Sequence, residues 1–178
     1  MRIFSDFSEF KAAVGTEIGA SEWIEITQDR INRFAEATCD EQWLHVDQDR
    51  ARKELPGGKT IAHGLLSLSL APMFIRSVMG LKGLRNTLNY GADRIRYLSP
   101  VPAGSRIRGR TSIAEVEDVP PDGLKVNYHM VIEIQGGQRP ACVAELIALH
   151  YRRGSEASLG ACGRRGAHAN GDASVRDP

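Results

Sequence analysis

The second half of the chain alternates apolar and polar residues with a period of two. Between residues 124 and 135, large apolar side chains such as Leu124, Tyr128 and Ile134 alternate with mostly polar ones such as Lys125 and Glu133. This pattern is typical of a strand with one buried face. A comparable pattern predicts a strand over 106–117, where a phase slip suggests a bulge. Another strand is predicted over 141–151, which is apolar on both faces apart from Glu145 and His150. Shorter strands are expected over 23–26, 84–89 and 94–98.

The first half of the chain has helical periodicity instead. A short helix is predicted over 27–38, where Thr27 can cap the N-terminus and Ile31 and Ala35 share one face. A second helix is predicted over 61–79. Its apolar residues cover nearly every side, so we expect it to be buried, and Pro72 must kink or split it.

Helices followed by a run of strands indicate an α+β fold with an antiparallel sheet. One apolar helix and roughly five strands suggest a sheet wrapped around that helix. The domain is expected to span 1–153. Residues 154–178 are rich in Gly, Ala and Ser and contain only two large aliphatic side chains. Such a segment cannot bury enough apolar surface to offset its ordering entropy, which predicts a disordered tail.

Composition narrows the class of protein. The 178 residues are 42% hydrophobic and 25% charged, as expected for one soluble globular domain. The 23 Lys and Arg residues nearly balance the 22 Asp and Glu residues, so no net field favours a nucleic-acid partner. No stretch has the apolar length of a membrane span, and no secretory signal is apparent. Three widely spaced cysteines without a C-x-x-C motif argue against disulfides or a zinc site and favour a cytoplasmic location.

The candidate chemistry begins just beyond the first predicted helix. Asp40 and His45 are five residues apart, and a loop there can direct both side chains to one point. A carboxylate and an imidazole suffice to add water to an activated double bond, because one takes a proton from water and the other delivers a proton to carbon. The spacing alone fits a structural interpretation better. In that interpretation Asp40 ends a helix and His45 precedes the next one, with Asp47 as its cap.

The second candidate segment surrounds Gly64, at the start of the apolar helix. A glycine there leaves backbone N–H groups uncovered, and such groups suit a developing oxyanion. Alternatively, Gly64 only permits close packing. His63 is interpreted as a partly buried structural histidine. Ser67 is a candidate donor to a substrate carbonyl, with hydrogen bonding back to its own helix as the alternative.

Together the two segments resemble the MaoC-like dehydratases, the family that contains the (R)-specific enoyl-CoA hydratases. The family pattern is an aromatic residue, small residues, Gly-Asp-x-Asn-Pro-Leu-His and, later, His-Gly. Residues 34–45 read FAEATCDEQWLH and residues 62–64 read AHG. Gln-Trp in place of Asn-Pro is similar to the branch related to nodulation protein N. The resemblance spans about 18–151. Cys39 replaces the usual glycine, which costs energy if that position needs a positive φ.

The resemblance implies a hot-dog fold and a homodimer that acts on acyl thioesters of coenzyme A without a metal or redox cofactor. It assigns catalysis to Asp40 and His45, which would hold one water. Asp40 would act as base while the water attacks C3 of a trans-2-enoyl-CoA, and His45 would orient the water and carry the proton to C2, giving (R)-3-hydroxyacyl-CoA. The Gly64 N–H would stabilise the enolate oxygen, and Gln42 would position the loop or the Asp40 carboxylate. A hot-dog thioesterase and a non-catalytic acyl-CoA-binding domain remain as alternatives.

Overall fold

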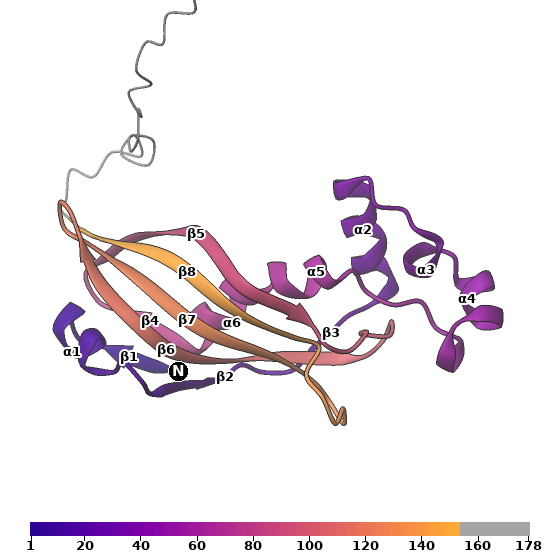
Figure 1. Cartoon of the computed structure of the whole chain (residues 1–178), viewed down its shortest axis with the longest axis horizontal. Helices are drawn as coiled ribbons and strands as arrows, with labels where there is room; N and C mark the ends of the chain where they lie inside the picture. The colour runs from indigo at the N-terminus through magenta and orange to yellow at the C-terminus, as the bar shows by residue number, and fades with distance from the viewer. Residues whose placement is uncertain (154–178) are drawn as a thin grey trace, which may run out of the picture.

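The computed structural model describes residues 1–153; the predicted tail over 154–178 lies outside the described residues. Its main feature is a six-stranded antiparallel sheet in the order β2-β6-β7-β8-β5, with β3 also paired to β6. Figure 1 shows that the sheet is strongly curled. Its strands are β2 (Glu17–Ala20), β3 (Ile24–Glu25), β5 (Leu84–Tyr97), β6 (Arg106–Val119), β7 (Gly123–Ile134) and β8 (Cys142–Arg152).

The period-two pattern located most of these strands, with two corrections. Strand β2 was not predicted, because four residues are too few to show a period. The register shift between Ile113 and Glu115 confirms the bulge predicted in β6. The two strands predicted over 84–89 and 94–98 are a single strand, β5, which pairs with β8 along its length. Shifts in its register, and a positive φ of 50° at Arg94, disturb the side-chain alternation but not the continuity of backbone pairing. The pattern therefore looked interrupted where the strand is not.

The apolar helix lies along the concave side of the sheet, as two segments, α5 (Gly64–Ser69) and α6 (Ala71–Val78). It begins three residues later than predicted. It is split at Leu70, which puts Pro72 in the first turn of α6, where the missing N–H costs no hydrogen bond. Phe74 of α6 packs directly on Gly109 of β6, where a Cβ would come within 2.6 Å of the Phe74 side chain. The sheet wraps this helix as expected, and the architecture is a hot-dog fold.

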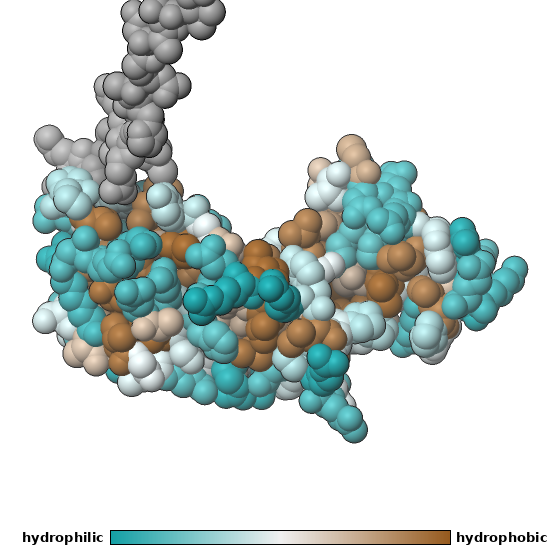
Figure 2. Space-filling view, viewed as in Figure 1, coloured by the Kyte–Doolittle hydropathy of each residue, from teal (hydrophilic) through white to brown (hydrophobic). Residues whose placement is uncertain are grey.

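The prediction that this helix is buried on every side is wrong for α5. Leu65 is 60% exposed, and the neighbouring strand β5 pairs with β8 on one side only. The exposed side chains of Tyr90 and Tyr97 also belong to β5. In the space-filling view, apolar side chains gather at the surface between the curled sheet and the helices at its end (Figure 2). Residues 1–153 of a single chain thus leave apolar surface exposed beside the free edge of the sheet.

The N-terminal residues close the other end of the core, which the sequence pattern did not predict. Strand β1 (Arg2–Phe4) pairs in parallel with β4 (Met79–Leu81), and the short helix α1 (Phe7–Ala12) follows. Phe4, Phe7 and Phe10 are buried in one cluster with residues of the sheet. Elements of three to six residues are too short to show a period, so only their tertiary contacts define them.

Three further helices form a lobe at the end of the sheet opposite α1 (Figure 1). They are α2 (Gln28–Thr38), α3 (Trp43–Val46) and α4 (Gln48–Glu54), followed by a 3₁₀ turn at Pro56–Gly58. Thr27 caps α2 through the Arg30 N–H, as predicted, and Asp47 caps α4 through the Arg50 N–H. No helix within residues 1–153 is long and apolar enough to cross a membrane.

Candidate active site

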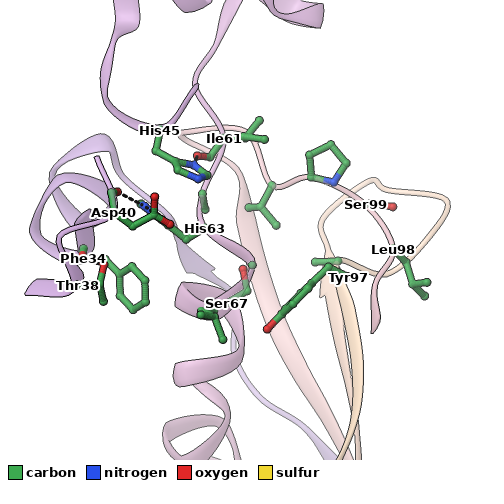
Figure 3. Close-up of a pocket in the computed structure, with 16 residues that line it drawn as sticks. Phe34, Thr38, Asp40, His45, Ile61, His63, Ser67, Tyr97, Leu98 and Ser99 are labelled. Carbon is green, nitrogen blue, oxygen red and sulfur yellow. Dashed lines mark hydrogen bonds and ion pairs between the residues drawn. The ribbon is translucent and has the colours of Figure 1, made fainter. Parts of the chain in front are cut away.

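A pocket of about 520 Å³ lies where the end of α2, helix α3, the start of α5 and the end of β5 meet. Figure 3 shows side chains from these segments facing one space. Both apolar and polar side chains line the pocket. The lining side chains include Phe34, Asp40, Ile61, Leu65, Val101 and Ala141, together with His45, His63, Ser67 and Tyr97. The pocket therefore combines an apolar wall with a small group of proton-exchanging side chains.

Asp40 is placed by the turn that ends α2. Cys39 adopts the left-handed conformation with φ 55°, and the Asp40 N–H donates to the Ala35 carbonyl over 3.1 Å. This is a common way for a helix to end, and it usually employs glycine. A non-glycine residue there costs about 1 kcal/mol or more. The departure from the family pattern at Cys39 is thus a real strain, but Asp40 still lines the pocket.

His45 lies in α3 and is 7% exposed. Its Nδ1 is 2.6 Å from the Ile61 carbonyl oxygen, and because a carbonyl only accepts, Nδ1 carries the hydrogen. The free ring nitrogen is therefore Nε2. Burial lowers the pKa of His45, and the nearby His63 lowers it further, although the Ile61 hydrogen bond and Asp40 oppose this effect. At neutral pH the ring is thus neutral, with a lone pair on Nε2.

His63 belongs to this site and is more than a distant structural histidine. Its Nε2 donates to the Asp40 main-chain carbonyl over 2.9 Å and lies 3.9 Å from the Asp40 carboxylate. The rings of His45 and His63 stack, with centroids 3.7 Å apart and an interplanar angle of 26°. The signal for His63 in the sequence was the His-Gly pair of the family pattern, which His63 forms with Gly64.

The polar atoms of Asp40 and His45 are close enough for one water molecule to bridge them. Polar atoms of Asp40, His45 and His63 all lie within 4.8 Å of one another. Two hydrogen bonds of about 2.8 Å that meet at one water oxygen span roughly this distance. The same three residues also form a potential donor set for a metal ion, although one nitrogen of each ring already faces a main-chain carbonyl. A carboxylate and an imidazole around one water can carry out acid–base chemistry on a neighbouring substrate.

Gly64 and Ser67 stand on the other side of the pocket. Gly64 is the first residue of α5, so its N–H has no partner within the helix. A Cβ at this position would come within 2.8 Å of the Tyr97 ring, so the close-packing interpretation of Gly64 is correct. Its use as an oxyanion donor stays a prediction. Ser67 is buried one turn further along the helix and lines the same pocket.

The expectation for the Gln42 side chain needs correction. This side chain is exposed, lies outside the pocket and makes no hydrogen bond to the other described residues, whereas its backbone carbonyl accepts the His45 N–H over 2.9 Å. The residue that fixes the loop is Gln28, which the sequence did not single out. Its amide donates to the His45 carbonyl over 2.8 Å, and its Oε1 accepts from the buried Thr60 hydroxyl. Gln28 therefore ties α2, α3 and the segment before α5 together.

Fold and site together define a hot-dog protein with a carboxylate–imidazole pair at the end of its central helix. The family model of the MaoC like domain matches residues 9–132, and the chain belongs to this family. The resemblance noted in the sequence is thereby confirmed. Membership supports a hydratase or dehydratase activity.

Similar proteins agree with this assignment. The chain is 42% identical to 3-hydroxyacyl-thioester dehydratase Z of Mycobacterium tuberculosis, over 83% of this chain and 97% of that protein. It is 41% identical to nodulation protein N of Rhizobium leguminosarum bv. viciae, over 80% and 89% of the two chains. Among solved structures, a monoamine oxidase regulatory protein from Archaeoglobus matches with a TM-score of 0.67 and 26% identity, over 85% and 97%. An (R)-hydratase from A. caviae, 20% identical over 75% and 96%, shares the fold with a TM-score of 0.60.

Proposed function

We propose that this protein adds water to trans-2-enoyl-CoA thioesters to give (R)-3-hydroxyacyl-CoA, and catalyses the reverse dehydration. The observation that carries the proposal is the convergence of Asp40 and His45 on one pocket that also holds the free N–H of Gly64. No metal or redox cofactor is needed, because the thioester carbonyl already activates C3 for attack and acidifies C2. Coenzyme A enters only as part of the substrate.

His45 is the group that exchanges the proton. Its Nδ1–H is held by the Ile61 carbonyl, so Nε2 is the nitrogen with a lone pair that can accept from a water. As the water oxygen bonds to C3, Nε2 takes one water proton and the π electrons of the double bond move to C2 and the thioester oxygen. The imidazolium then gives the same proton to C2. No proton is gained or lost overall, and the ring returns to its starting state.

Asp40 accepts a hydrogen bond from the other water hydrogen and stabilises the imidazolium electrostatically. Asp40 raises the pKa of His45, which reflects this attraction. The family resemblance instead assigns the base to Asp40 and leaves His45 to orient the water and deliver the proton to C2. The hydrogen bond at Nδ1 and the pKa lowered by burial favour His45, because this nitrogen is already a neutral acceptor when the substrate binds.

Gly64 and Ser67 complete the reaction centre. The negative charge that develops on the thioester oxygen needs a donor present before the reaction starts, and a backbone N–H at a fixed helix start supplies one without reorganisation. Ser67 projects into the same pocket and orients the thioester. The apolar remainder of the lining accommodates the acyl chain.

We propose further that the protein is a homodimer. Within residues 1–153, strand β5 is a 14-residue edge of the sheet that pairs with β8 alone, and such an edge is normally covered. Leu65, Tyr90 and Tyr97 expose apolar surface beside it. A second copy that pairs at β5 covers this surface and encloses the open side of the pocket. Light scattering at micromolar concentration tests the proposal, and a monomer would contradict it.

Crotonyl-CoA is the substrate for the decisive assay. Hydration removes the enoyl absorbance while the thioester stays intact, which is the result we expect. Release of free coenzyme A thiol would instead identify a thioesterase. Saturable binding without either change would identify a non-catalytic binding domain. Both of these outcomes overturn the proposed hydration. Chiral analysis of the 3-hydroxyacyl product tests the (R) configuration.

A further inference from the structure

His63 contacts each part of the proposed reaction centre. It precedes Gly64 in the chain, its ring stacks on His45, and its Nε2 hydrogen-bonds to the Asp40 main chain. Phe34 also packs against its ring, with centroids 5.1 Å apart. The side chain is 3% exposed, so these contacts fix it in place. One residue thereby connects the turn after α2, helix α3 and the start of α5.

The two ring nitrogens of His63 are used differently. Nε2 faces a carbonyl oxygen and therefore carries the hydrogen. Nδ1 is buried and has no hydrogen-bond partner within residues 1–153. Histidines that serve packing alone normally have both nitrogens satisfied, so the unpaired nitrogen needs another explanation. The contacts of His63 with Asp40 and His45 explain it. They fix the ring in a position where Nδ1 has no hydrogen-bond partner.

We propose that His63 is a positioning residue that holds Asp40 and His45 at the separation one water can bridge and keeps Nε2 of His45 directed at that water. The inference rests on the proposed hydration. The hydrogen bond from His63 Nε2 restrains the Asp40 backbone. The stacked His63 ring prevents the His45 ring from rotating about its hydrogen bond to the Ile61 carbonyl. Small displacements of a catalytic group cost about 100-fold in rate.

The stacking has an electrostatic consequence. The titratable groups that act on His45 are Asp40, from the turn after α2, and His63, from the residue before α5. Two imidazolium rings at this distance repel each other, so His63 favours the neutral form of His45 and adds to the lowering of its pKa by burial. Loss of the His63 ring should therefore move the acidic limb of the pH–rate profile to higher pH.

Two variants separate these effects. His63→Gln retains an N–H donor near the Asp40 carbonyl but has no ring, whereas His63→Leu has neither. We expect kcat for crotonyl-CoA hydration to fall less than 10-fold in His63→Gln and about 100-fold in His63→Leu, with KM within threefold of wild type in both. The acidic limb of kcat/KM should shift to higher pH in both variants. A residue that only fills space would change the melting temperature but not this limb.

Nitrogen-15 NMR of the histidine rings gives a second readout that does not depend on turnover. In the wild-type protein we expect the Nδ1–H tautomer for His45 and the Nε2–H tautomer for His63. In His63→Leu, the His45 signal should indicate a mixture of tautomers. The positioning proposal is overturned if folded His63→Leu has an unchanged kcat, an unchanged acidic limb of kcat/KM and an unchanged His45 tautomer. The proposed hydration would be unaffected by that result. If His63→Leu does not fold, His63→Gln tests the proposal instead. An acidic limb of kcat/KM that does not shift in His63→Gln would then overturn the positioning role. A wild-type protein that does not hydrate crotonyl-CoA refutes the function, and the NMR still tests the positioning of His45.

Discussion

The imidazole rings of His45 and His63 stack on each other, yet each is held by a different main-chain carbonyl through a different ring nitrogen. His45 donates from Nδ1 to Ile61, and His63 donates from Nε2 to Asp40. The backbone thus sets both tautomers before any substrate arrives. Such pre-organisation explains how a short loop and a helix start can act as one acid–base centre.

Substitution of the catalytic pair is expected to abolish most hydration without unfolding the protein. Asp40→Asn cannot stabilise an imidazolium, and His45→Gln cannot exchange a proton at neutral pH. Each should lower kcat/KM for crotonyl-CoA about 10²–10⁴-fold. Because both act on one water, the double variant should be little worse than the worse single variant. Circular dichroism is the folding control. Near wild-type turnover in folded Asp40→Asn would refute the mechanism.

The pH dependence of the reaction distinguishes the two possible bases. If neutral His45 takes the water proton, kcat/KM rises with pH through the His45 pKa and is then constant. Burial places this pKa below the ordinary value of 6.5, so the plateau should include neutral pH. If Asp40 were the base and His45 the acid, kcat/KM would instead fall as pH rises through the same range. Stopped-flow measurements from pH 4.5 to 8 on a protein shown to stay folded make the comparison.

The family motif was sufficient to find Asp40, His45 and Gly64, but the sequence could not define how they are held. The sequence could not show that His63 stacks on His45, because this stacking is a tertiary contact between segments with no shared periodicity. Gln42 was expected to position the loop or the Asp40 carboxylate because of its place in the motif. It lies within the motif, but its side chain is exposed and outside the pocket, and Gln28 hydrogen-bonds to the His45 carbonyl from another helix.

The fold shows the same division between local and tertiary information. A strand with one buried face, such as β7, displays its period in the sequence and was predicted within one residue at each end. Strand β5 lies at an edge and is irregular, so its pattern broke while its backbone pairing continued. The parallel pair of β1 and β4 joins residues far apart in the chain and has no local signature.

Replacement of Cys39 by glycine should stabilise the protein. Its φ of 55° strains any residue with a Cβ, and glycine removes this strain at a modest entropic cost in the unfolded chain. We expect Cys39→Gly to raise the free energy of unfolding by about 0.5–1 kcal/mol. Cys39→Ala retains the Cβ and should be near neutral, which makes it the matched control. Urea denaturation measures both, and a destabilised Cys39→Gly would contradict the expectation.

A side chain at position 64 should disturb the reaction centre through Tyr97. The added Cβ of Gly64→Ala would lie within 2.8 Å of the Tyr97 ring, so the ring or the helix start must move. We expect a loss of about 1–3 kcal/mol in stability and a drop in kcat. The double variant Gly64→Ala/Tyr97→Ala removes the clash. If it recovers stability but not kcat, the position of the Gly64 N–H matters for the reaction; a kcat unaffected in Gly64→Ala would argue against that role.

His150 lies in the core away from the pocket and should make the fold sensitive to acid. Its Nδ1 is 2.7 Å from the Thr87 hydroxyl and its Nε2 is 2.6 Å from the Tyr128 hydroxyl. The ring is 2% exposed, and burial lowers its pKa to about 4 from 6.5. A neutral ring with two hydroxyl partners is well accommodated here, whereas a buried imidazolium is not.

The sign of this acid sensitivity follows from proton uptake. Between pH 6.5 and about 4 the unfolded chain binds a proton at His150 that the folded protein excludes, so the free energy of unfolding decreases as pH falls through this window. Above pH 6.5 the contribution is fully present, and below about pH 4 it is lost. Its size is on the order of 3 kcal/mol. Urea denaturation of His150→Gln, which retains hydrogen-bonding groups but does not titrate, should show a shallower dependence than wild type over this window. Parallel curves for the two proteins would show that His150 is not the responsible group.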